Sequence, residues 1–207
     1  RLARFGQRCV SFCDRFSHHF RRRTRTVETP VKHYLCGLLQ AETKNMERME
    51  EVVPEANHQA LQHMLSESAW EERAVLDQVA QEANQHLGGH PDSGLIIDES
   101  GCPKKGRQSV GVARQWCGQL GKVENCQVGV FAALGRGTEA TLIDERLFLP
   151  ESWTADPARC QAAGIPAEQR GFKRKHDLAL EMITHARKRQ IGFAWVGFDG
   201  LYGSDPA

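Results

Sequence analysis

Two apolar runs that each end in an aspartate constrain the fold of this chain more than any other feature. Leu95-Ile96-Ile97 precedes Asp98, and the run from Ile191 to Phe198 precedes Asp199. Short apolar runs of this kind predict buried strands, and we expect Trp195 in the core. A carboxylate is costly to bury alone, so an aspartate at the end of such a strand usually has a hydrogen-bonded, cationic or metal partner.

The segment between the two runs predicts two further strands and one helix. The strand candidates are residues 126–133 and 139–148, and the helix begins near Phe172. The order is strand, strand, strand, helix, strand, with residues 101–106 as a turn and residues 150–171, which are rich in proline and glycine, mostly as loop. In such a unit the first and fourth strands can lie side by side as a parallel pair. Asp98 and Asp199 would then meet at one edge of the sheet.

Two converging carboxylates offer only oxygen ligands, which suits Mg²⁺ or Mn²⁺. With a third carboxylate they could hold two ions, one on the attacking and one on the leaving oxygen of a phosphodiester. The alternative is that each aspartate is an ordinary turn or cap residue, a common role for this residue type. Spacing alone does not separate the two interpretations. Glu99 would point to the opposite face if the strand continued, which favours a structural role.

The first ninety residues predict a helical domain. Apolar residues recur at helical spacing from Val75 to Leu87, and Gly88-Gly89 ends that helix. Ser68-Ala69-Trp70-Glu71 reads as a capping box at its start. We therefore expect a helical domain over residues 1–92, followed by a second domain over residues 93–207.

Charge is unevenly distributed along the chain. Residues 1–30 carry eight arginines against two acidic residues, whereas residues 31–93 carry four basic and eleven acidic residues. A cationic end of this kind suggests local contact with a polyanion. It can equally be a solvated arm, or an arm that lies on the acidic segment.

Composition excludes several classes of protein. With 40% hydrophobic residues the chain is not disordered, and no apolar run approaches the about 20 residues of a membrane helix. The basic start is followed by no apolar signal-peptide core. The seven cysteines form no Cys-x-x-Cys pair, which indicates a reducing, cytosolic compartment. Zinc at Cys9 and Cys13 with His18 and His19 would lack a second pair at good spacing, so small buried hydrophobes are the favoured interpretation.

One long block between the two aspartates is unusually specific in its order of residues. It comprises Asp98-Glu99-Ser100-Gly101-Cys102-Pro103-Lys104-Lys105-Gly106, Ser109-Val110-Gly111-Val112-Ala113-Arg114-Gln115-Trp116-Cys117-Gly118 and Gly121-Lys122-Val123-Glu124-Asn125-Cys126-Gln127. This block resembles the signature of bacterial insertion-sequence transposases of the DDE type, which have a ribonuclease-H-like catalytic domain. The resemblance runs from about residue 20 to the last residue, and further matches include Arg146-Leu147-Phe148-Leu149-Pro150, Trp195 and Tyr202-Gly203.

The resemblance implies an α/β fold, in which a helical N-terminal domain precedes an incomplete ribonuclease-H-like domain with a mixed sheet. The family's first and second catalytic aspartates map onto Asp98 and Asp199, as ligands of Mg²⁺ or Mn²⁺. The activity implied is cut-and-paste DNA transposition on double-stranded DNA, at transposon ends and target. Self-association, no membrane contact and a cytoplasmic, nucleoid-associated location in a bacterium are expected.

The family's third carboxylate, a glutamate on a later helix, has no counterpart among the eight residues after Asp199. We therefore expect a truncated N-terminal part of a transposase that is inactive or impaired by itself. The alternative is a catalytically inactive DNA-binding remnant of a decayed insertion sequence. A metal-dependent nuclease without strand transfer is a more remote possibility.

Basic residues near the aspartates and near the N-terminus are the candidate DNA contacts. Lys104, Lys105 and Arg107 would contact phosphates beside the scissile bond, although an exposed charged turn would have the same composition. The N-terminal part is expected to bind transposon DNA, which makes its densest basic run the candidate for backbone contact: Arg21, Arg22, Arg23 and Arg25. The basic runs that bracket the helix after Phe172 read better as a solvated helix face.

Overall fold

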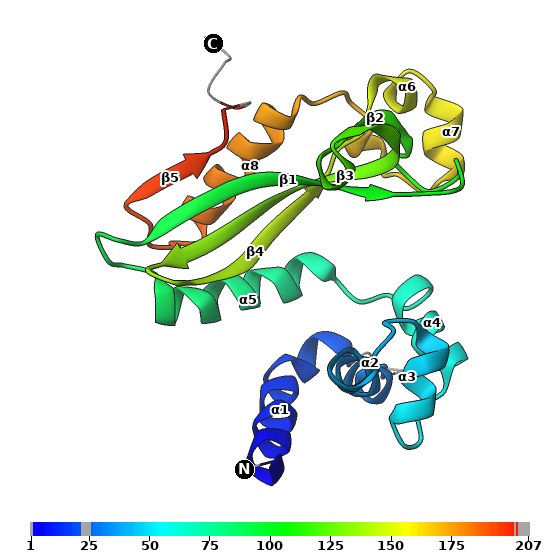
Figure 1. Cartoon of the computed structure of the whole chain (residues 1–207), viewed down its shortest axis with the longest axis vertical. Coiled ribbons are helices and arrows are strands. Elements are labelled where there is room, and N and C mark those ends of the chain that lie inside the picture. The colour runs from blue at the N-terminus through cyan, green and yellow to red at the C-terminus, as the bar shows by residue number, and fades with distance from the viewer. Residues whose placement is uncertain (1, 22–25, 201, 203–207) are drawn as a thin grey trace. The chain divides into compact units, whose positions relative to one another are not determined.

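The computed structural model of the chain describes residues 2–21, 26–200 and 202. The chain forms two compact units, Arg1–Val75 and Leu76–Ala207, and each is described by itself (Figure 1). The division falls inside helix α5 (Glu72–Leu87), upstream of the boundary near residue 92 that composition indicates. Its reason is that the buried side of α5 belongs to the core of the second unit.

The first unit is helical, as predicted. Its small core is built around Met49, with Ala41 and Leu61, and Tyr34 and Leu38 pack against it. Asparagine side chains cap the start of two of its helices by accepting hydrogen bonds from free backbone amides of the first turn. Asn45 accepts from the amide of Arg48, and Asn57 accepts from the amide of Ala60. The helices are α1 (Leu2–Phe16), η1 (Ser17–Phe20), α2 (Glu28–Gln40), α3 (Met46–Val52) and α4 (His58–Ser66).

The predicted capping box at Ser68 is wrong. Helix α5 begins at Glu72, and the Ser68 hydroxyl instead donates to the carbonyl of His63 at 3.1 Å, at the end of α4. Trp70 likewise turns back, and its indole N–H donates to the carbonyl of Met64 at 2.9 Å. These contacts cap the C-terminal end of α4, because the last carbonyls of a helix need hydrogen-bond donors from outside it.

The second unit contains a mixed five-stranded sheet in the order β2-β3-β1-β5, with β4 also paired to β3. All pairs are antiparallel except β1 with β5, and α8 lies behind the strands in Figure 1. The predicted ribonuclease-H-like class of fold, a mixed sheet after a helical part, is confirmed. The strands are β1 (Gly94–Pro103), β2 (Ala113–Cys117), β3 (Lys122–Arg136), β4 (Glu139–Leu147) and β5 (Trp195–Phe198).

Several predicted boundaries differ from the structure. β1 runs to Pro103, so residues 101–103 are strand rather than turn, and β5 begins only at Trp195. β2 was not predicted. The segment 150–171 is not mostly loop, since it contains short helices. The helices of this unit after β2 are η2 (Gly118–Leu120), α6 (Glu151–Thr154), α7 (Pro157–Ala162), η3 (Ala167–Gln169) and α8 (Lys175–Lys188).

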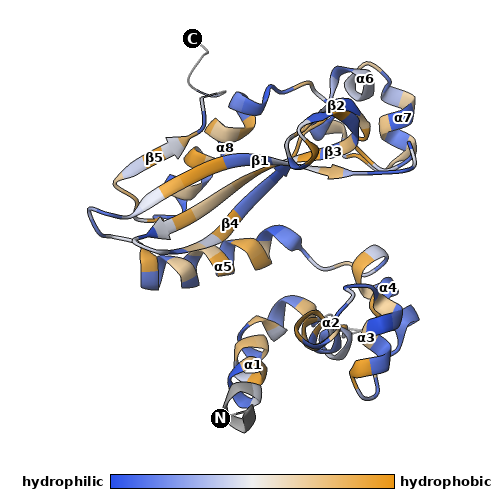
Figure 2. Ribbon diagram, in the orientation of Figure 1, coloured by the Kyte–Doolittle hydropathy of each residue, from blue (hydrophilic) through white to orange (hydrophobic). Residues whose placement is uncertain are grey.

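The two faces of the sheet have different surroundings. Leu95, Ile97 and Leu134 share one face, here called the packed face, with the buried side of α8 around Met182. Successive residues of a strand point to opposite faces, so Ile96 and Asp98 belong to the other face, here called the open face. Both residues are exposed. Figure 2 shows the change along β1 from hydrophobic to hydrophilic.

Trp195 lies on the open face and is not a core residue, contrary to the sequence prediction. It pairs with Gly94 across the parallel ladder, and its side chain remains 46% exposed. A Cβ on Gly94 would lie 2.2 Å from the Trp195 ring, so the glycine makes room for the indole. No helix in the described part of the chain is both long and apolar enough to span a membrane.

Candidate active site

The parallel pairing of β1 with β5 brings the two predicted aspartates to neighbouring strands. Its last pair is Ile97 with Phe198, and Asp98 and Asp199 are the next residue on each strand (Figure 1). Neighbouring strands lie about 4.8 Å apart, so the two backbones are close at this point. The predicted meeting of residues that are 101 positions apart in the sequence is therefore confirmed for the backbone.

Both aspartates are exposed and belong to the open face. Asp98 pairs with Phe131 of β3, and Asp199 follows two open-face residues of β5, Trp195 and Gly197. One carboxylate oxygen of Asp98 accepts the backbone amide of Glu99 at 2.7 Å, which orients the side chain. A ligand can therefore reach this edge of the sheet from solvent.

The donor set at this edge fits a hard divalent cation, because carboxylate oxygens are the ligands that Mg²⁺ and Mn²⁺ prefer. Within the described ranges, no group of three or more histidine, cysteine or acidic side chains gathers in a way that could hold a metal ion. Asp98 and Asp199 thus supply two carboxylate groups, and further ligands would have to come from water or from other groups.

Glu99 turns away from Asp98 to the packed face, as strand alternation predicts. Its carboxylate accepts from Lys175 at 2.6 Å, and the two side chains are only 14% and 19% exposed. The contact joins β1 to the first residue of α8. Among described residues, three buried polar atoms near this pair have no hydrogen-bond partner: Glu99 Oε2, His176 Nε2 and Tyr202 Oη.

Tyr202 links this packed-face cluster to the aspartates. It is buried, its ring lies 5.2 Å from that of His176, and it stacks on Phe198 at 5.9 Å. Burial first, and then the charges of Glu99, Asp199 and Asp98, raise the pKa of Tyr202 well above its usual value. The hydroxyl therefore keeps its proton at ordinary pH. The sequence prediction that Lys175 belongs to a solvated helix face is wrong, because its side chain is largely buried against Glu99. No role was predicted for Tyr202.

Replacing Lys175 by Met should destabilise the second unit by about 1–3 kcal/mol, because the largely buried Glu99 carboxylate would lose its cation. Urea unfolding measures this loss. In the double variant with Glu99→Gln, the loss should be smaller than the sum of the single losses. The matched control is Lys173→Met, which removes an exposed ion pair with Glu181 and should change stability by less than about 0.5 kcal/mol. Equal effects of the two lysine variants would contradict the account.

The basic residues that follow β1 lie far from the aspartates along the sheet. Lys104 comes six residues after Asp98, which at the rise of an extended strand is about 20 Å. Lys105 and Arg107 are exposed, and neither forms an ion pair with a carboxylate in the described part of the chain. At this distance from Asp98, these three cations are badly placed to contact the phosphates directly beside the scissile bond. They could contact phosphates farther along a DNA duplex.

The loop that carries these cations is held by side chains that sequence reasoning missed. Asn125 of β3 donates from its amide to the carbonyls of Lys104 and Gly106, at 2.6 and 2.8 Å. Arg159 of α7 donates to the carbonyl of Arg107 at 2.8 Å. Asparagine is uncommon inside strands, so its presence in β3 was the sequence feature that could have indicated this role.

Arg21, the described member of the N-terminal basic run, is exposed and engaged. Its guanidinium donates to both carboxylate oxygens of Glu28, at 2.9 and 3.2 Å, and this contact lowers the pKa of Glu28. A phosphate would have to compete with Glu28 for it. Arg22, Arg23 and Arg25 lie outside the described residues.

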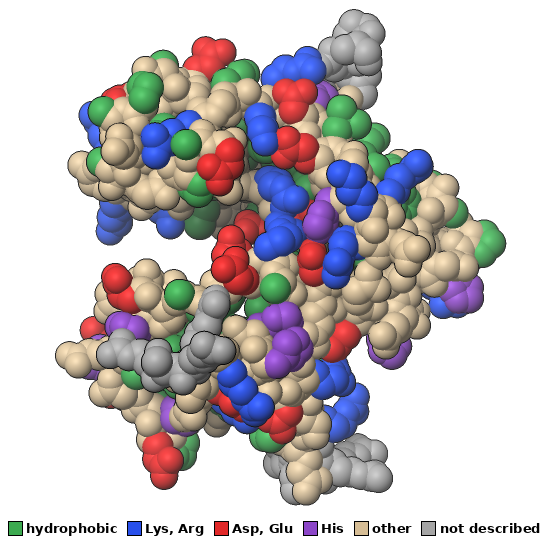
Figure 3. Space-filling view, turned by 180° about the vertical axis from the view of Figure 1, so that it is seen from behind, with side chains coloured by type: hydrophobic (Ala, Val, Ile, Leu, Met, Phe, Trp, Pro, Cys, Tyr) green, Lys and Arg blue, Asp and Glu red, His purple; other side chains and the backbone are tan. Residues whose placement is uncertain are grey.

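The basic residues around α8 are mixed with acidic ones over that side of the unit (Figure 3). Arg174 contacts Asp177 at 3.2 Å, and Lys173 contacts Glu181 at 2.7 Å. The hydrogen bonds from Arg174 lower the pKa of Asp177. This surface matches the predicted solvated helix face except at Lys175, which is largely buried against Glu99.

Two comparisons with known proteins show the family of this chain. The family model described as DDE superfamily endonuclease matches residues 14–207. A probable transposase for insertion sequence element IS701 from Microchaete diplosiphon is 37% identical over 160 residues, which is 77% of this chain and 39% of that protein. The chain thus spans about two fifths of the length of this relative. No solved structure matches the chain significantly.

The matched region includes both strands of the parallel pair and both aspartates. It confirms the resemblance to DDE transposases of insertion sequences that the block from Asp98 to Gln127 indicates. On these grounds, the chain belongs to the DDE superfamily endonucleases.

Proposed function

We propose that this chain is the part of an insertion-sequence transposase that carries the first two acidic residues of the active site. The proposal is cut-and-paste DNA transposition by phosphodiester hydrolysis and strand transfer. The observation that supports it most is the register of β1 and β5, whose last pair, Ile97 with Phe198, directly precedes the exposed Asp98 and Asp199.

Asp98 and Asp199 would hold a divalent cation, Mg²⁺ or Mn²⁺, which when bound supplies a Lewis acid toward a phosphodiester oxygen. The chain's own contribution is positional. The amide of Glu99 orients Asp98, and the ion pair of Glu99 with Lys175 fixes β1 against α8. Tyr202 keeps its proton beside these carboxylates and so offers a hydroxyl donor.

DNA is the proposed partner, in double-stranded form at transposon ends and target. Lys104, Lys105 and Arg107 are proposed to contact its phosphates some 20 Å along β1 from Asp98, or about six nucleotides away at the strand spacing of DNA. Arg21, Arg22, Arg23 and Arg25 are proposed as further backbone contacts. Association with the bacterial nucleoid would follow from such contacts. Self-association stays part of the proposal.

A third acidic side chain is proposed to complete the site, since no described group supplies it. By itself the chain should therefore cleave DNA slowly. The second candidate is a DNA-binding protein without catalytic activity. The observation that favours it is that the described residues offer two carboxylates at this site and not a third. A nuclease without strand transfer would produce nicks and no joined products.

Nicking of supercoiled plasmid in Mn²⁺ tests the proposal. We expect slow nicking by the 207-residue chain, at least about 100-fold slower in Asp98→Asn and Asp199→Asn, because a metal ligand contributes several kcal/mol to the transition state. The matched control is Asp92→Asn, an exposed aspartate before β1 at its other end, which should nick like the unaltered chain.

The outcomes separate the candidates. Equal nicking by Asp98→Asn and the unaltered chain would contradict the proposed site. DNA binding with no nicking in any metal would favour the second candidate. Joined products in addition to nicks would support strand transfer.

A further inference from the structure

The β2–β3 hairpin exposes a tryptophan that the core does not use. Trp116 is 55% exposed, and its direct partner across the ladder, Val123, is 50% exposed. The hairpin's packing is provided by its other face, where Cys117, Cys126 and Val128 are buried together. A large exposed apolar pair is the kind of surface that calls for a functional explanation.

Side-chain hydrogen bonds brace the hairpin where it carries Trp116. Gln115 donates from its side-chain amide to the carbonyls of Gly111 and Cys126, at 3.2 and 2.9 Å. Gln127 donates to the carbonyl of Val110 at 2.6 Å. A fixed platform loses little conformational entropy when a flat ligand settles on it.

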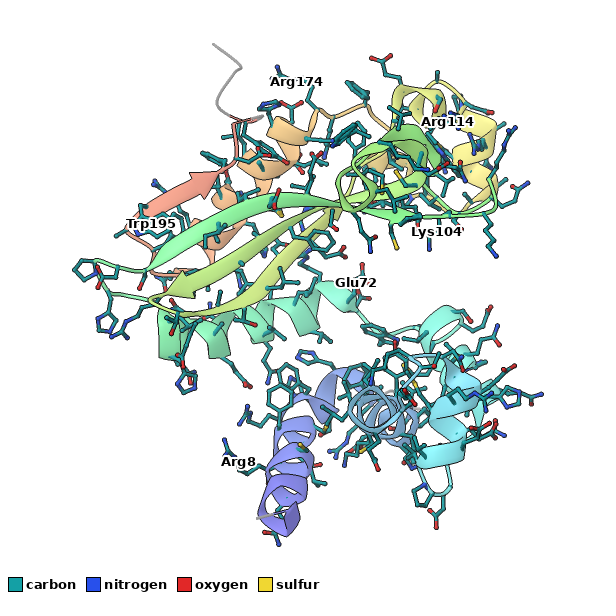
Figure 4. All side chains as sticks on the ribbon, in the orientation of Figure 1. Arg8, Glu72, Lys104, Arg114, Arg174 and Trp195 are labelled. Carbon is teal, nitrogen blue, oxygen red and sulfur yellow. The ribbon has the colours of Figure 1, made fainter. Side chains whose placement is uncertain are left out.

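Cations lie beside this apolar pair. Arg114 is exposed two residues before Trp116 and therefore on the same side of β2, whereas Lys122 directly precedes Val123 and belongs to the other side of β3. Both interact with the single carboxylate of Glu124. Lys104 lies at the same end of the sheet as Arg114 (Figure 4). The cations exceed the carboxylates here, so the surface is complementary to a polyanion.

Trp116 shares the open face with Asp98. Asp98 pairs with Phe131, and Val123, the partner of Trp116, lies eight residues earlier on β3, about 26 Å along an extended strand. At about 3.4 Å per nucleotide this distance corresponds to about eight nucleotides. A DNA strand that follows the open face from Asp98 would therefore reach Trp116.

We propose that Trp116 stacks on an unpaired base of the DNA bound along the open face, with Arg114 contacting an adjoining phosphate. The inference rests on the proposed function, because it takes its partner from there. A flat indole beside cations is the arrangement by which proteins hold unpaired bases, and every base offers an aromatic face. Base pairs within a closed duplex are already stacked on both sides, so the preference is for a base outside the stack.

Binding of two otherwise identical duplexes tests this inference, one fully paired and one with a single unpaired 2-aminopurine. The assay contains EDTA, so no cleavage is needed, and anisotropy gives the affinity while 2-aminopurine fluorescence reports stacking. The variants are Trp116→Ala, Trp116→Phe and, as the matched control, Leu180→Ala, which removes an exposed apolar side chain from α8.

We expect Trp116→Ala to bind the bulged duplex about 5- to 150-fold more weakly and to abolish the quenching of 2-aminopurine. Trp116→Phe should retain most of both, and Leu180→Ala all of both. The dependence of affinity on salt should be unchanged in Trp116→Ala and shallower by about one ion in Arg114→Ala.

Unchanged affinity of Trp116→Ala for the bulged duplex would overturn the inference. So would a loss of self-association in Trp116→Ala with no selective loss of bulged DNA, since the patch would then be a protein interface. If the unaltered chain binds the duplexes but Trp116 is irrelevant, the proposed function survives and the inference fails. If it binds neither duplex, both fail.

Discussion

Replacing Asp98 by Asn is expected to weaken Mn²⁺ binding by more than about 100-fold, because loss of a direct ligand costs more than the 10- to 100-fold typical of outer partners. Asp199→Asn should have a comparable effect, since the two residues follow the last pair of the same parallel ladder. Electron paramagnetic resonance of free Mn²⁺ during titration measures the affinity.

The control for this prediction is Asp92→Asn, which removes an equally exposed carboxylate at the other end of β1. Its Mn²⁺ affinity should equal that of the unaltered chain. A change no larger in Asp98→Asn than in Asp92→Asn would show that the cation is held elsewhere.

Replacing Trp153 by Ala should cost about 3–5 kcal/mol of stability in the second unit, the range for deleting a large buried aromatic. Trp153 is 1% exposed and packs with Cys160 and Ile165. Its indole N–H donates to the carbonyl of Val112 at 2.9 Å, and the Arg159 guanidinium lies 3.7 Å from its ring. The residue thus ties α6 and α7 to the segment that precedes β2.

Urea unfolding with circular dichroism measures the effect. Trp153→Phe is the informative comparison, because it keeps an aromatic ring in the core and loses the bond to Val112; it should cost clearly less than the alanine variant. A loss below about 1 kcal/mol in Trp153→Ala would contradict the packing described here.

The sequence was sufficient to predict the class of fold and the meeting of the two aspartates. Apolar runs marked β1 and β5, and strand order alone allowed them to be neighbours, which the register of Ile97 with Phe198 confirms. The opposite orientation of Glu99 followed from strand alternation and is confirmed by its contact with Lys175.

Features that depend on tertiary contacts could not be predicted in this way. β2 contains Arg114 and Gln115 among its five residues and pairs only with β3, so its short segment shows no apolar run. Lys104 follows Asp98 closely in sequence but is separated from it by the remaining length of β1. Trp195 looked like a core residue because apolar character does not reveal which face of a sheet is covered.

Local signals also misled where a nearby partner competed. Ser68 had the residue type and spacing of a helix cap, yet the free carbonyl of His63 at the end of α4 was within reach of its hydroxyl. Tyr202 belongs to the family match, but no role followed from it, since its importance comes from burial beside charges on β1 and after β5.

Iron-directed cleavage of the polypeptide tests the central claim most directly. Fe²⁺ can replace Mg²⁺ at oxygen sites, and with ascorbate and peroxide it cuts the backbone next to the ion. The account predicts cuts near both residue 98 and residue 199 in the same molecules, and the loss of both cuts in Asp98→Asn and in Asp199→Asn alike. Cutting near one aspartate only, or cutting at both that persists in either variant, would contradict it.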